Sequence, residues 1–136
     1  MTTFPVFRRG ARWCAGAALS GLVIVFLAFD TAIKLMELPV VGETLITLGW
    51  PADSAVLLGV ILLIATALHA IPRTALIGAV LLTAYLGGAV AAHVRIGSPL
   101  WSHILFGVYV GALMWGGLLL RDPALARMLL RRRDQA

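Results

Sequence analysis

The sequence predicts an all-α fold: a polytopic membrane four-helix bundle with both termini in the cytoplasm. The first observation is composition, since 61% of the 136 residues are hydrophobic and 12% are charged, against roughly 45–50% and about 25% in soluble domains. The second is that the apolar residues form runs of about 17 residues or more, long enough for a helix to cross the ~30 Å hydrocarbon core of a bilayer. The third is the absence of period-two alternation, so the runs predict helices and not the strands of a barrel.

Proline, glycine and charged residues divide the runs into elements. We expect a single membrane domain over residues 1–136, with spans at about 13–36, 55–71, 75–94 and 100–120 and a basic cytoplasmic tail over 121–136. Prolines and glycines interrupt the connector after the first span, and Val40–Leu48 within it predicts a short amphipathic helix at the interface. Pro72 ends the second span, and Thr74 is a candidate N-cap for the third.

The first run also fits another class of segment, because a basic head before an apolar stretch is typical of a signal peptide. The run is longer than the usual ~7–15-residue core of a signal peptide, and no A-x-A cleavage motif follows it. We therefore expect a first span that is retained.

The positive charges predict the orientation of the bundle. Nine of the eleven Lys and Arg residues fall in the head, the second turn and the tail, and the opposite side holds only Lys34 and Arg95. The positive-inside rule places the nine in the cytoplasm, so the first and third connectors face outward, which is the periplasmic side of the inner membrane if the cell is a Gram-negative bacterium. Because these arginines lie at membrane ends, the net charge of +5 indicates contact with membrane lipids, and no nucleic-acid partner is expected.

Small residues recur at four-residue spacing on two of the spans. Ala84, Gly88 and Ala92 do so on the third span, and Gly107 and Gly111 on the fourth. Because small side chains let helix backbones approach closely in lipid, both series predict helix–helix contacts.

The predicted topology brings polar side chains of several spans to the outer end of the bundle. Asp30 lies about 25 Å along the first helix from Trp13, and Lys34 follows at the spacing that favours an ion pair. His93 and His103 flank the third turn at the same level. Ionisable groups at membrane depth are costly and indicate a function by default. The candidate ligand-binding pocket consists of Asp30, Lys34, Tyr85, His93, Arg95 and His103.

Alternatives stay open for these groups. Asp30 and Lys34 either form part of a pocket or only orient the first helix. The histidines either form hydrogen bonds at the interface or exchange protons with a ligand such as a quinone, the one cofactor considered. A metal is not predicted, because a ten-residue separation across a turn matches no ligand motif. His69 belongs to the cytoplasmic end, where we expect it to form a hydrogen bond outside the pocket.

Five segments stand in an order and spacing typical of one known family: Phe29–Leu35, Leu48–Pro51, Ile71–Ala75, Tyr85–Arg95 and Trp115–Asp122. Over about residues 15–123 the chain resembles the DoxX-like family of small bacterial four-helix membrane proteins. The resemblance implies that fold and supports Asp30, Lys34, His93 and Arg95 as a shared polar cluster. Wider relatives include a subunit of an archaeal thiosulfate:quinone oxidoreductase and membrane components linked to oxidative-stress defence, which implies quinone-linked redox work. The single cysteine, Cys14, prevents carrying over sulfur chemistry that uses a cysteine pair.

Three functions are consistent with these features. The first is a redox-associated, quinone-linked subunit that binds a small hydrophobic ligand and assembles with partner membrane or redox subunits. The second is a non-enzymatic scaffold or assembly subunit, whose small-residue faces bind partner chains. A small-solute carrier is the weaker alternative, because no span is broken near its middle. Whether the chain is an enzyme is left open.

Overall fold

The computed structural model describes residues 6–130, and all regular elements in this part of the chain are helical. The arginine run at residues 131–133, which is predicted to belong to the cytoplasmic tail, lies outside the described residues. The elements are α1 (Val6–Leu35), α2 (Pro39–Thr47), α3 (Ser54–Ala70), α4 (Ala75–Arg95), the single π-helical turn η1 (Leu100–Ile104), α5 (Phe106–Arg121) and α6 (Pro123–Leu130).

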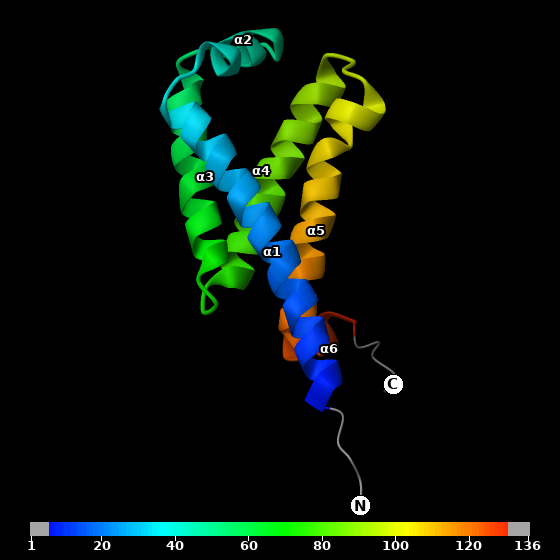
Figure 1. Ribbon diagram of the computed structural model, residues 1–136. Coiled ribbons are helices and arrows are strands. Elements are labelled where there is room, and N and C mark those ends of the chain that lie inside the picture. Colours follow the sequence, from blue (N-terminus) through cyan, green and yellow to red (C-terminus); the bar gives the residue numbers. More distant parts are fainter. Residues whose placement is uncertain (1–5, 131–136) are drawn as a thin grey trace, which may run out of the picture.

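Helices α1, α3, α4 and α5 pack side by side as a bundle (Figure 1). α1 contacts α3 and α5, and α4 completes the ring by contacting the same two helices. The two short helices lie at opposite ends: α2 packs on α3, and α6 packs on α5 (Figure 1). We call these the α2 end and the α6 end; the first turns of α1 lie at the α6 end.

The apolar core does not extend equally along all helices. On α4 the buried residues lie between Ala75 and Leu86, and none of residues 87–95 is buried. η1 has no buried residue. At the α2 end, Val41 and Leu45 of α2 instead form a small second core with Ala55 of α3. Consequently α4 and α5 diverge from α1 and α3 toward the α2 end, as Figure 1 shows.

The outer surface of the bundle is apolar. Phe29, Leu57 and Trp101 expose 65%, 63% and 73% of their surface, respectively. Three helical segments, Gly10–Leu35, Ala75–Arg95 and Leu100–Arg121, are long and apolar enough to cross a membrane. α3 is apolar but shorter, with 17 residues. The chain thus has the features of a multi-span membrane protein, and a count of four spans and the cytoplasmic termini stay predictions.

The helix bounds differ from the expected spans mainly at two places. α1 begins at Val6, so the basic head joins the first helix instead of preceding it. The fourth span begins with the π-helical turn η1, which follows Pro99 and gives way to α5 at Phe106. The expected short helix of the first connector is present as α2, and Pro39 occupies its first turn, where a missing N–H costs no hydrogen bond.

Glycine permits two close helix crossings in the α6-end half of the bundle. A Cβ atom on Gly117 of α5 would lie 2.9 Å from the backbone nitrogen of Ser20 in α1. A Cβ on Gly78 of α4 would overlap the backbone of His69 in α3. Backbone atoms cannot rotate away as a side chain can, so these helix pairs have fixed spacing.

The two predicted series of small residues behave differently. Gly107 packs as expected, because a Cβ there would lie 3.2 Å from the Leu86 carbonyl oxygen of α4. A Cβ on Gly88 would meet nothing within 4 Å, so the contact predicted there for the third span is not made within residues 6–130 and stays a prediction. α1 and α3 diverge from α4 at this level, whereas Val90 on another face of α4 packs on Gly107 of α5.

Candidate functional site

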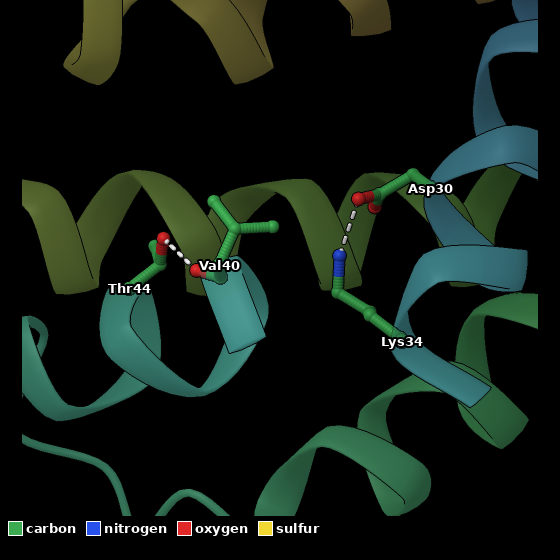
Figure 2. A network of polar contacts seen from close by, with 4 residues as sticks. All are labelled: Asp30, Lys34, Val40 and Thr44. Carbon is green, nitrogen blue, oxygen red and sulfur yellow. Dashed lines mark hydrogen bonds and ion pairs between the residues drawn. The ribbon is translucent and has the colours of Figure 1, made fainter. Parts of the chain in front are cut away.

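Asp30 and Lys34 form an ion pair near the α2 end of α1. The Lys34 Nζ donates to the Asp30 Oδ1 at 2.5 Å, and the two side chains retain 26% (Asp30) and 15% (Lys34) of their exposure. Figure 2 shows both side chains pointing toward one another on the side of α1 that faces α2. Tyr85 of α4 packs against the apolar core. The predicted pairing of Asp30 with Lys34 is therefore present, and no hydrogen bond joins Tyr85 to it in the described part of the chain.

His93 and His103 lie against each other across the third turn. Their ring centroids are 5.5 Å apart with an interplanar angle of 65°. His93 Nδ1 shares a hydrogen bond with Ser98 Oγ at 2.9 Å, and His103 Nδ1 shares one with Ser102 Oγ at 2.8 Å. His93 is half-buried and His103 is exposed. The π-helical turn that carries His103 thus returns it to the last turn of α4.

Arg95 links α4 to α2. Its Nη2 donates to the carbonyl oxygen of Leu48, the residue that caps the C-terminus of α2. The last carbonyls of a helix lack intrahelical donors and carry partial negative charge, so a guanidinium is well matched to this position. Gly49 follows in the left-handed region with φ 77°, which favours glycine. A Cβ at Gly49 would come within 2.6 Å of the Arg95 guanidinium, so glycine also leaves room for this contact.

A groove lies beside this link, between the end of α2 and the last turns of α4. Its volume is about 430 Å³, and it is lined by Gly49, Trp50, Gly88, Ala91, Ala92 and Arg95. The lining residues are therefore one tryptophan, one arginine and four small residues. The volume falls in the range of about 300–1,000 Å³ that small-molecule sites occupy.

The predicted site residues thus form three arrangements at one end of the bundle. These are the Asp30–Lys34 pair, the His93–His103 pair, and Arg95 in the lining of the groove, while Tyr85 packs on the apolar core. Within residues 6–130 no hydrogen bond or ion pair joins one arrangement to another. The groove itself was not predicted, because the sequence predicts helix packing for Gly88 and Ala92.

The sequence analysis also did not predict that several polar side chains are buried together in the α6-end half of the bundle. His69 is fully buried, and its Nδ1 donates to the Ala75 carbonyl at 3.1 Å, the kind of hydrogen bond expected for it. Its Nε2 has no partner, and neither have the buried Ser20 Oγ, Thr66 Oγ1 and Arg121 Nε among the described residues. Ser20 and Thr66 are isolated polar residues in apolar runs, which is the signal that the sequence offered. Buried polar atoms of this kind are commonly satisfied by internal water.

The comparisons with known proteins agree with this architecture. The DoxX-like family matches residues 18–117, a range that includes α2, α3, α4 and the groove. No curated protein and no solved structure matches the chain. The match covers most of the chain and every arrangement described above. This multi-span membrane protein therefore belongs to the DoxX-like family.

Proposed function

We propose that the chain is a redox-associated, quinone-linked subunit of the bacterial inner membrane, and that the groove between α2 and α4 receives the ring of the ligand. The observation that carries the proposal is the lining of the groove. Gly88, Ala91 and Ala92 present little side chain, so a flat ring can approach the α4 backbone closely. Trp50 also lines the groove, and its indole would supply an apolar face on which such a ring can stack.

Arg95 supports a ligand with acceptor oxygens at its edge. A guanidinium has five N–H donors, and the structure uses one acceptor, the Leu48 carbonyl, to hold it in place. The remaining donors suit the carbonyl oxygens of a quinone, which have no N–H or O–H of their own. The fixed position of the guanidinium reduces the entropy lost when the ligand binds.

The half-buried Asp30–Lys34 pair supplies the second element of the proposal. A charged pair near membrane depth is costly because both ions lose hydration, and its presence there favours a role. In the proposed function this pair and the two histidines supply proton-exchanging groups at the same end of the bundle as the groove. The groove would then bind the ring, and these groups would exchange protons with it through water.

Quinone retention tests the proposal. The protein is extracted into lipid nanodiscs, and its bound isoprenoid quinone is measured by mass spectrometry. Gly88→Leu places a large side chain in the groove, whereas Gly87→Leu places it beside the groove; neither Cβ meets another atom within 4 Å. The two variants gain similar helix propensity, so they form a matched pair.

We expect quinone to be lost in Gly88→Leu, weakened in Arg95→Gln, Asp30→Ala and His93→Ala, and retained in Gly87→Leu. Absence of quinone from the parent protein, or equal retention in the two glycine variants, would refute the proposed function.

One observation favours the alternative of a non-enzymatic assembly subunit. A Cβ on Gly88 would meet nothing within 4 Å in the described structure, and small residues of this kind accept a partner helix in lipid. In that case Gly88→Leu would remove a co-purifying membrane partner, Gly87→Leu would retain it, and no quinone would be found in either. The same two variants thus distinguish the two functions.

A further inference from the structure

The third turn holds the two histidines of the α2 end in a fixed relation. Gly97 adopts φ 68°, and the backbone N–H groups of Gly97 and Ser98 donate to Val94 and His93 at 3.1 and 3.0 Å. On the far side of the turn, the His103 N–H donates to the Pro99 carbonyl at 3.1 Å. The ten residues from His93 to His103 are therefore closed by backbone hydrogen bonds, and the pair of rings does not depend on a free loop.

The spacing of the rings matches two imidazoles on one metal ion. A Zn–N bond is about 2.0–2.1 Å, so adding the distance from a ring nitrogen to its centroid puts two tetrahedrally arranged ring centroids about 5.2 Å apart. The observed separation is 5.5 Å, with the rings inclined by 65°. The centroid separation is therefore close to that of two imidazoles on one ion, and the T-shaped contact would give way to one in which both Nε2 atoms face that ion.

The serine partners supply a second, independent indication. Ser98 and Ser102 each engage the Nδ1 atom of one histidine, and the described structure gives neither Nε2 a partner. Histidines that bind metal through Nε2 almost always donate the other ring N–H to an oxygen, which fixes the tautomer and the ring orientation. Each imidazole here has this arrangement.

The neighbouring charges permit a cation at this position. Arg95 is two residues from His93, but its guanidinium is directed to the carbonyl end of α2 and not to the imidazoles. Among residues 6–130 no group of three or more His, Cys, Asp or Glu side chains is placed to hold a metal. An ion bound here would therefore have two protein ligands and keep its other positions for water.

We propose that His93 and His103 bind a divalent transition-metal ion of the class that imidazole prefers, such as Zn²⁺, Ni²⁺ or Cu²⁺, through their two Nε2 atoms. The site has open coordination positions, which is the arrangement of metals that act on a bound molecule and not of closed structural sites. Neither histidine lines the groove, so Zn²⁺ binding can be measured whether or not the chain retains quinone. An ion on both Nε2 atoms would replace the proton exchange assigned to these imidazoles under the proposed function.

Direct titration tests the site. The protein carries a purification tag without histidine and the substitution Cys14→Ser, because the exposed thiol of Cys14 is itself a metal ligand. Zn²⁺ binding in nanodiscs is measured by competition with a chromophoric chelator. The variants are His93→Ala, His103→Ala, the double variant Ser98→Ala/Ser102→Ala, and Trp101→Phe as a control on the same exposed turn.

We expect one Zn²⁺ per chain, with affinity lowered about 10-fold or more in the serine variant and by a larger factor in each histidine variant. Trp101→Phe should bind as the parent does. The proposal fails if the parent binds no ion, if either histidine can be replaced without loss, or if Trp101→Phe lowers the affinity as much as the histidine variants do.

Discussion

The crossing of α1 and α5 allows a sharp test of the packing. A Cβ on Gly117 would lie 2.6 Å from Ser20 Oγ, 2.9 Å from the Ser20 nitrogen and 3.1 Å from the Gly16 carbonyl oxygen. A Cβ on the adjacent Gly116 would meet nothing within 4 Å. Both positions are inside α5, so Gly→Ala improves helix propensity by the same amount, about 1 kcal/mol, and this gain cancels when the two variants are compared.

The difference between Gly117→Ala and Gly116→Ala therefore measures overpacking alone. Overpacking costs about 1–3 kcal/mol, and we expect about 2–3 kcal/mol here because two of the three atoms met belong to the backbone. Far-UV circular dichroism during SDS titration of mixed micelles measures the free energy of unfolding. Gly116→Ala should be as stable as the parent or more so. Equal stability of the two alanine variants would refute the close α1–α5 approach.

Three further predictions concern polar contacts. Asp30→Ala alone should destabilise the fold more than Asp30→Ala combined with Lys34→Ala, because the single change leaves a half-buried ammonium unpaired, at a cost of about 1–3 kcal/mol; SDS unfolding measures both, and a worse double variant would contradict the pairing. Arg95→Gln should increase hydrogen exchange of the amides at the end of α2, measured by mass spectrometry, while exchange in α3 stays unchanged; protection equal to the parent would show that the link does not hold α2. Thr83→Val removes the acceptor of the Trp115 indole N–H, a 2.9 Å bond between α4 and α5, and should cost about 0.6 kcal/mol, the average for such bonds in membranes; a loss above about 2 kcal/mol would mean that the hydroxyl has a larger role.

The helices could be predicted from the sequence because lipid offers no hydrogen bonds to the backbone, so an apolar run that crosses it must satisfy its own N–H and C=O groups. Apolar runs bounded by Pro39, Pro72 and Pro99 correspond to helices in the structure, and a short helix follows the first run. The Asp30–Lys34 pair was also predictable, because four-residue spacing on a helix brings the two side chains together without any tertiary contact.

The groove was not predictable because the sequence hardly distinguishes a core-facing surface from a lipid-facing one. In a soluble helix, polar residues mark the outer face, but here Leu82 is buried while its neighbour Leu81 is 43% exposed. Likewise Gly88 and Gly107 look alike in the sequence, and only the divergence of the helices leaves one open and the other packed. The contact between Arg95 and α2 joins residues 47 positions apart, and no local pattern indicates it.

The tight packing at one end of the bundle has a mechanical consequence for the other. About 25 Å of helix separates Gly78, where α4 is pressed against α3, from Arg95 in the wall of the groove. If α4 tilts as a rigid helix, a change of about 5° at Gly78 displaces Arg95 by about 2 Å. That displacement is comparable to the length of a hydrogen bond, so it is enough to make or break the link to α2. A change in the crossing angle at Gly78 would therefore change the width of the groove, and substitutions near Gly78 should change the retention of the proposed quinone without contacting it.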